Sequence, residues 1–174
     1  MIQETENQLN TPAYNKVNFF ILVKGGASAF IKFVENVFDA HENRKARTPD
    51  KDGTLIHAEI QIADSMILVA DSKDDWPFTP AFPQVYVDNA EEILEKAEKN
   101  GAVIITEVSD FYGGQKIARF KDPWQNIWWL FAKNESTQNV KETQEVNTDW
   151  HDKKPGYIYT TIMDAMRNLR KEIE

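Results

Sequence analysis

The chain has 174 residues, of which 41% are hydrophobic, so it can bury the core of one ordinary domain or of two small coupled modules. Its 28 acidic residues outnumber its 20 basic residues, and the resulting net charge of −8 argues against non-specific binding to nucleic acid. The absence of cysteine excludes disulfides, thiolate metal ligands and a thiol nucleophile.

Residues 1–16 are polar and contain Pro12, which predicts a loose N-terminal arm without the apolar core of a signal peptide. No apolar run approaches the roughly 18 to 20 residues that a membrane span requires. We therefore expect a cytoplasmic protein that has neither a membrane nor a nucleic acid as its partner.

A first unit, residues 17–71, is predicted to form a strand, a helix and three further strands. Its opening strand, residues 17–23, is apolar and β-rich, and the two glycines that follow it open a helix. Apolar residues recur at helical spacing from Ala29 to Phe38, which is typical of a helix that covers a sheet. The turn-forming run TPDKDG then precedes two strands, IHAEIQI and MILVADS.

Strict alternation in IHAEIQI separates two faces of one strand. The apolar face, predicted to pack under the helix, consists of Ile56, Ala58, Ile60 and Ile62. The polar face, predicted to look into whatever the sheet encloses, consists of His57, Glu59 and Gln61.

A second unit, residues 82–132, repeats the same order of elements after a proline-rich linker, residues 72–83. Phe82 occupies the place in this unit that Phe19 occupies in the first. Asn89 is predicted to be the N-cap of the second helix, and Gly101 to follow its C-terminus.

Beyond the repeat, residues 134–156 are polar and predict a flexible linker. Residues 157–174 predict an amphipathic helix, which must bury its apolar stripe on its own domain or on a second subunit. That stripe consists of Ile158, Ile162, Ala165, Met166, Leu169 and Ile173.

Three segments carry a family resemblance: DGTLIHAEIQIADSMILVADS, VYVDNAEEILEKAEKNGA and GGQKIARFKDPWQNIWWLFAK. In this order they resemble the vicinal oxygen chelate superfamily of glyoxalases, bleomycin-resistance proteins and dioxygenases, and within it the PhnB-like group. The resemblance covers residues 17–133. It implies an α+β fold of paired βαβββ modules whose curled sheets close around a cup, with the last helix added, and it implies a homodimer.

The metal-dependent members of that superfamily hold their ion with His, Gln or Glu side chains from the first and last strands of each module. By spacing, the resemblance carries those positions to Phe19, Leu68, Phe82 and Trp129. None of these side chains offers the oxygen or imidazole donor that a divalent cation needs. We therefore expect no metal and no other cofactor.

Alternation along the strands predicts which side chains face the cup, and a slip of one residue would exchange the faces. The set combines aromatic walls with a few polar groups, as is typical of a small-molecule pocket. In the first module it consists of Phe19, Ile21, His57, Glu59, Gln61 and Leu68. In the second it consists of Phe82, Gln84, Tyr86, Arg119, Trp129 and Phe131.

Two polar features of this set leave alternatives open. His57 and Glu59 can act as an acid–base pair on one ligand, or they can form an ordinary hydrogen-bonded pair in a wet cavity. Arg119 can bind a ligand carboxylate or phosphate bidentately, or it can form a salt bridge with Glu59 or another carboxylate.

The leading hypothesis is a metal-free protein that binds a small aromatic or amphipathic molecule in the cup. One alternative is a lyase or isomerase that uses the acid–base chemistry of His57 and Glu59. A further alternative is a regulatory or interaction module that contacts its partner through the C-terminal helix. A fold alone does not decide among these functions.

Overall fold

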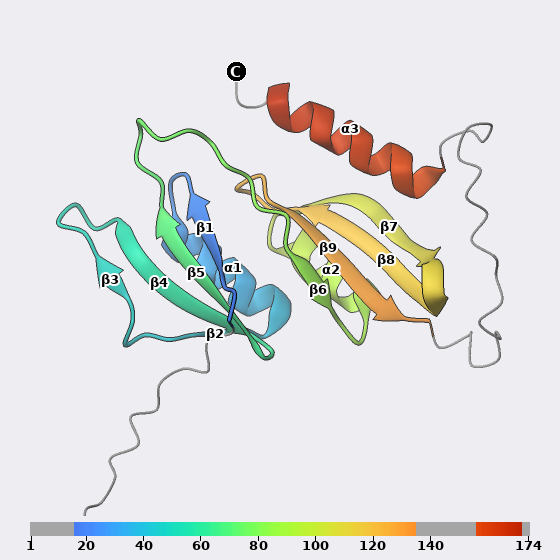
Figure 1. Cartoon of the computed structure of the whole chain (residues 1–174), viewed down its shortest axis with the longest axis horizontal. Helices are drawn as coiled ribbons and strands as arrows, with labels where there is room; N and C mark the ends of the chain where they lie inside the picture. Colours follow the sequence, from blue (N-terminus) through green and yellow to red (C-terminus); the bar gives the residue numbers. More distant parts are fainter. Residues whose placement is uncertain (1–15, 135–155, 172–174) are drawn as a thin grey trace, which may run out of the picture.

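The computed structural model describes residues 16–134 and 156–171, which form two sheets and three α-helices (Figure 1). The predicted arm up to residue 15 and the predicted linker from 135 to 155 lie outside the described residues. The elements of the first unit are β1 (Phe19–Val23), α1 (Ala27–Phe38), β2 (His41–Glu42), β3 (Thr48–Pro49), β4 (Leu55–Ile62) and β5 (Ser65–Asp71). Those of the second are β6 (Gln84–Tyr86), α2 (Ala90–Lys99), β7 (Val103–Phe111), the 3-10 turn η1 (Tyr112–Gly114), β8 (Gln115–Lys121) and β9 (Ile127–Lys133). The C-terminal helix is α3 (Tyr157–Lys171).

Both sheets have the strand order that two copies of one unit require. The first runs β1-β5-β4-β2, with β3 also paired to β4, and the second runs β6-β9-β8-β7. In each sheet the first strand pairs in parallel with the last strand of its unit, and the remaining pairs are antiparallel. This confirms the predicted α+β class and its paired βαβββ modules. The short strands β2 and β3, which divide the second strand of the first module, were not predicted individually.

The N-terminus of α1 is capped by a residue from another strand. Gly26 stands at the N-cap position but has no side chain to offer. Instead, Asp71 at the end of β5 accepts hydrogen bonds from the backbone N–H groups of Gly26 at 3.0 Å, Ala27 at 2.8 Å and Leu55 at 2.7 Å. Burial raises the pKa of Asp71, but these three N–H groups and nearby Lys73 outweigh burial and hold the pKa below its ordinary value.

The helix α2 carries its own cap, as predicted. The side chain of Asn89 accepts a hydrogen bond from the backbone N–H of Glu92 at 3.0 Å. Gly101 follows the helix with a φ of +93°, a left-handed conformation that favours glycine.

A single hydrophobic core spans both modules. The helices α1 and α2 pack against each other behind the sheets in the view of Figure 1. From α1, Phe30 and Phe38 contact the ring of Trp128 in β9, with centroid distances of 6.3 Å and 4.9 Å. Because the helices and the inner faces of both sheets meet in this core, each sheet turns its other face outward.

The register of β1 corrects one part of the predicted pattern. Phe20, not Phe19, pairs with Leu68, which in turn pairs with Glu59. Ile21 pairs with Val69 and is 1% exposed within the core. Phe19 and Ile21 therefore have the parity of the helix side of the first sheet, and Phe20 has the parity of the outward face.

A second correction concerns Ile56, which was predicted to lie with the core side chains of β4. Its neighbours in the alternation, Ala58 and Ile60, are fully buried, but Ile56 is 52% exposed. The register with β5 begins only at Ala58, and Ile56 lies opposite the irregularity in the pairing of β4 with the short strand β3.

Candidate functional site

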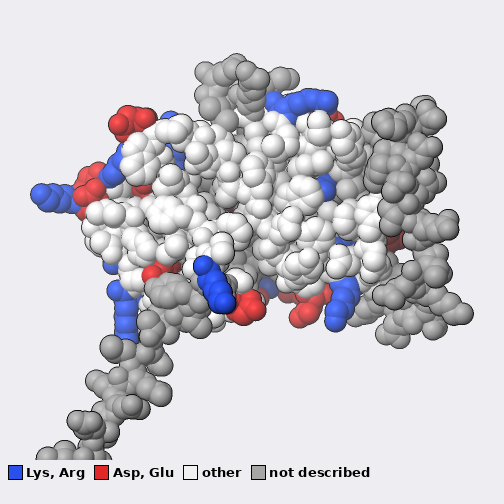
Figure 2. Space-filling view, in the orientation of Figure 1, with Lys and Arg blue, Asp and Glu red and all other residues white. Residues whose placement is uncertain are grey.

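The outward face of the second sheet gathers most of the candidate side chains of that module. The register places Gln84, Trp129 and Arg119 side by side across β6, β9 and β8. It also places Tyr86 beside Phe131, and their rings stack with centroids 5.4 Å apart. Figure 2, drawn in the orientation of Figure 1, shows a face that is mostly uncharged, with acidic and basic side chains concentrated near its edges.

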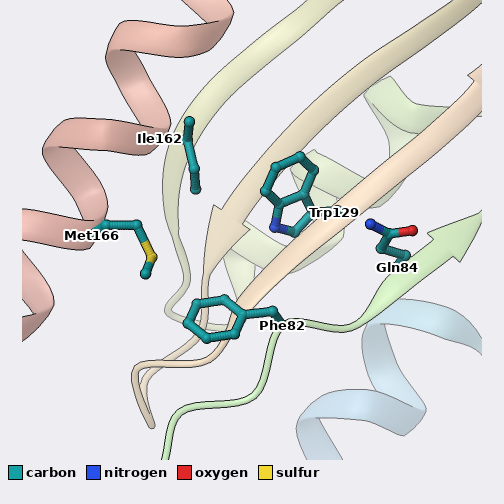
Figure 3. Close-up of a pocket in the computed structure, with 5 residues that line it drawn as sticks. All are labelled: Phe82, Gln84, Trp129, Ile162 and Met166. Carbon is teal, nitrogen blue, oxygen red and sulfur yellow. The ribbon is translucent and has the colours of Figure 1, made fainter.

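A pocket of about 280 Å³ lies between this face and the C-terminal helix (Figure 3). Phe82, Gln84 and Trp129 line it from the sheet side, and Ile162 and Met166 line it from α3. Phe82, Gln84 and Trp129 are among the site residues predicted from the sequence, whereas Ile162 and Met166 are not. Ile162 and Met166 belong to the apolar stripe of the predicted C-terminal helix, so the sequence indicated that they are covered. No pattern in the sequence around them indicates which surface covers them.

The helix α3 is held on the second sheet by three polar contacts near its N-terminus. The backbone N–H of Glu107 donates to the hydroxyl of Tyr157 at 3.0 Å, and the hydroxyls of Thr106 and Thr161 lie 2.8 Å apart. Arg119 donates to the backbone carbonyl of Ile158 at 2.9 Å. Of the alternatives predicted for the amphipathic helix, the structure shows packing on its own chain.

Arg119 is a buried cation that has no carboxylate partner among the described residues. It is 2% exposed, and its guanidinium carbon lies 3.7 Å from the centroid of the Trp129 ring. Its Nη1 donates to the hydroxyl of Thr106 and to the carbonyl of Ile158, whereas its buried Nε has no hydrogen-bond partner. Burial lowers the pKa of Arg119 to about 10, so the side chain remains charged at neutral pH.

On the outward face of the first sheet, His57 and Glu59 form the contact that their spacing predicts. His57 Nε2 lies 3.1 Å from Glu59 Oε1, and Asn43 donates to Glu59 Oε2 at 2.8 Å. Glu59 is only 4% exposed. A salt bridge between Arg119 and Glu59, one of the two alternatives for Arg119, does not form, and the two side chains belong to different sheets.

The remaining candidates of the first module do not converge on one point. Leu68 is half-buried beside Glu59. Gln61 is exposed, and its amide donates to the carbonyl of Ala63 at 2.9 Å in the adjoining turn. One pocket that the described residues form lies between the second sheet and α3, and the cup between the two sheets remains a prediction.

The side chains at the positions carried over for a metal do not fit a metal ion. With the observed register, Phe20 rather than Phe19 pairs with Leu68, and Gln84 rather than Phe82, which precedes β6, pairs with Trp129. Only Gln84 offers an oxygen donor. Within residues 16–134 and 156–171, no group of three His, Cys, Asp or Glu side chains is placed to hold an ion.

Comparisons with known proteins agree with this architecture. The family model described as Glyoxalase/Bleomycin resistance protein/Dioxygenase superfamily matches residues 16–130. An uncharacterized protein of Mycobacterium bovis is 28% identical over 120 residues, which cover 63% of this chain and 78% of that protein.

Solved structures with the same fold have low sequence identity. A PhnB protein from Bacillus cereus, described as a putative 3-demethylubiquinone-9 3-methyltransferase, is 19% identical with a TM-score of 0.54, over 68% of this chain and 99% of that one. The fosfomycin resistance protein FosX from Listeria monocytogenes is 17% identical with a TM-score of 0.56, over 70% and 95%. In the described part of this chain, no helix has the length and apolar character needed to cross a membrane.

Proposed function

Because the chain belongs to the glyoxalase/bleomycin resistance protein/dioxygenase superfamily, we propose that it binds a small aromatic or amphipathic molecule, without a metal ion, on the outward face of its second sheet. The observation that carries this proposal is the pocket between that sheet and α3. Its volume of about 280 Å³ is near the lower end of the range for small-molecule sites. The ligand is therefore expected to be small.

The walls of the pocket support an aromatic ligand. Phe82 is 44% exposed, and Trp129 lies half-buried beside it, so both rings offer surface to a planar molecule. Gln84 supplies a polar group on the same wall. Rings that stack in this way contribute about 0.5–1.5 kcal/mol per pair beyond the burial of their area.

A thermal-shift screen of small aromatic compounds tests this proposal. A compound present at 100 times its dissociation constant stabilises the protein by about 2.7 kcal/mol, which gives a measurable rise in Tm. Replacing Trp129 by leucine is expected to weaken each hit about tenfold, because the stacking surface is lost. Trp76→Leu is the matched control, since Trp76 is 45% exposed on the linker between the modules. Hits whose affinity is unchanged in Trp129→Leu would place the ligand elsewhere.

The contact between His57 and Glu59 favours one alternative, an enzyme that moves a proton. Glu59 is buried and bonded to Asn43, so it can hold the imidazole of His57 in one orientation while the other ring nitrogen faces a substrate. If this alternative holds, a compound that binds beside His57 on the first sheet is expected to be converted by the wild type, and by His57→Ala at least about 100-fold more slowly. Equal turnover by wild type and variant would eliminate the acid–base role.

The predicted homodimer remains a prediction. Phe19 and Phe20 are 68% and 51% exposed on β1, which is an edge strand of the first sheet. Exposed aromatic side chains at an edge are typical of a surface that meets another chain.

A further inference from the structure

We propose that Arg119 is the anion-binding group of this pocket and that α3 is a displaceable cover seated on it, so that the ligand is an aromatic molecule bearing a carboxylate or phosphate-type group. The inference rests on the proposed function, because it names the ligand class and the moving part of the same site.

Arg119 is a buried guanidinium without a carboxylate partner among the described residues. Taking a guanidinium out of water carries a large desolvation cost, which proteins usually offset with a carboxylate or another anion. No described carboxylate performs that role here, and the buried Nε has no partner. A planar group with unused donors matches the geometry of a carboxylate or phosphate.

In the structure, Arg119 donates a hydrogen bond to the helix α3. Its acceptor on α3 is the backbone carbonyl of Ile158, which also accepts from the hydroxyl of Thr161 at 3.3 Å. A neutral carbonyl is a weaker partner for a guanidinium than an anion is, because an anion adds Coulomb attraction between opposite charges and can bind bidentately. An anionic ligand therefore competes directly with the seat of α3.

The helix α3 buries fewer of its described side chains than the other two helices do. Over its described side chains only Leu169 is buried, and the half-buried ones are Ile158, Thr161, Ile162, Met163 and Ala165. Met166 is 41% exposed although it lines the pocket. In contrast, α1 buries six side chains in the core. Elements with little buried apolar surface open at the lowest free energy.

Trp129 connects the pocket with the guanidinium of Arg119. Trp129 lines the pocket, and its ring also lies against the guanidinium of Arg119. The guanidinium lies over the face of the Trp129 ring, so an aromatic body on Phe82 and Trp129 has a positive charge against the same ring. That charge is reached once the Ile158 carbonyl moves away.

The test uses the full chain and three probes of one shape: 2-naphthoate, 2-naphthyl phosphate and the neutral 2-naphthamide. Isothermal titration calorimetry gives the affinities. The wild type is expected to bind at least one anionic probe about tenfold more tightly than the amide, since a charge-assisted hydrogen bond distinguishes them. Whichever of naphthoate and naphthyl phosphate binds more tightly identifies the anion.

Arg119→Met removes the cation and keeps a long apolar side chain. It is expected to abolish the preference for the anionic probes, and the amide should bind at least as tightly as it does to the wild type, because the bond that holds Ile158 is also lost. Its Tm is expected to be no lower than that of the wild type, because a buried charge without a counter-ion is removed. Arg44→Met is the matched control: Arg44 is exposed, and its loss should leave both the preference and the Tm unchanged.

The cover is tested separately with Tyr157→Phe, which removes the hydrogen bond between Glu107 and α3 and leaves the side chains that line the pocket unchanged. It is expected to bind the preferred anionic probe about tenfold more tightly than the wild type does, with a smaller gain for the amide. Asn168→Ala, on an exposed position of α3, is the control. In hydrogen exchange, the anionic probe should accelerate exchange at the backbone amides of α3, and the amide probe should not.

The outcomes separate the two proposals. If no probe binds any variant, the pocket is not a ligand site and both proposals fail. If the three probes bind equally and Arg119→Met changes nothing, the proposed function stands and the anion site is wrong. If the anion preference depends on Arg119 but hydrogen exchange in α3 is unaltered, the cover is wrong and Arg119 is reached with α3 in place.

Discussion

Trp128→Ala is expected to lower the free energy of unfolding by about 4 kcal/mol, since truncating a buried tryptophan leaves a large cavity. Trp128 is fully buried, and its ring packs on Phe38, Phe120 and Phe30 at 4.9, 6.0 and 6.3 Å. Phe30 and Phe38 belong to the first module and Trp128 to the second, so the cavity opens where the modules meet. Urea denaturation followed by circular dichroism measures the loss.

A polar contact adds to this loss. The indole N–H of Trp128 donates to Asp122 at 2.9 Å, and burial raises the pKa of Asp122 although four hydrogen bonds favour its charged form. Trp128→Phe removes this donor but fills most of the volume. Its free energy of unfolding should therefore lie between that of the wild type and that of Trp128→Ala. Trp76→Ala should stay within about 0.5 kcal/mol of the wild type. A loss below about 1 kcal/mol for Trp128→Ala would contradict the shared core.

Asp71→Asn is expected to destabilise the protein by about 3 kcal/mol. One side chain of Asp71 serves three backbone N–H groups, two at the start of α1 and one at the start of β4. An amide retains one oxygen and turns an NH₂ group toward the remaining donors, so at least one buried N–H loses its acceptor. Asp74→Asn, at an exposed position three residues later, is the control.

The pH dependence of this difference follows from the lowered pKa of Asp71. A carboxyl group whose pKa is lower in the folded state stabilises the fold above its unfolded pKa, here 3.8, and loses that contribution as pH falls through the folded value. The gap between wild type and Asp71→Asn should therefore be constant from about pH 8 to pH 5 and shrink below about pH 4. A gap that is equally wide at pH 3 would show that the carboxylate charge is not what caps α1.

The elements that have a clean period in the sequence were predicted most closely. Helical spacing identified α1, α2 and α3, and the cap at Asn89 was readable because its partner lies only three residues away. The role of Asp71 was not readable, because it joins atoms 44 and 45 residues apart and leaves no local pattern.

Predicting the faces of strands succeeded only where the sequence alternates. In β4, polar residues mark every second position, and His57 and Glu59 do contact each other. In β1, the run Phe19–Val23 is apolar throughout, so nothing in it distinguishes the helix side from the outward side. Phe19 and Ile21 were assigned to the outward face by aligning the two units. That alignment is one residue out of register at β1, because Phe20 pairs with Leu68.

The position of α3 depended on tertiary contacts alone. Its apolar stripe predicted that the helix must pack against another surface. The contacts that decide which surface, Thr106 with Thr161 and Arg119 with Ile158, join residues 55 and 39 positions apart, so no local pattern shows them. The partners of Arg119, Thr106 and Ile158, are also distant in the sequence, so the sequence alone did not decide between a bound anion and a salt bridge.

Because α3 has no counterpart in the first module, it breaks the internal pseudo-symmetry of the molecule. Two sheets with the same strand order turn the same kind of face outward, yet one face is roofed by a helix from its own chain and the other keeps its buried Glu59 beneath His57. A substitution in α3 therefore alters the chemistry of one half while the other is untouched. The duplicated halves are thereby free to serve as two unlike surfaces.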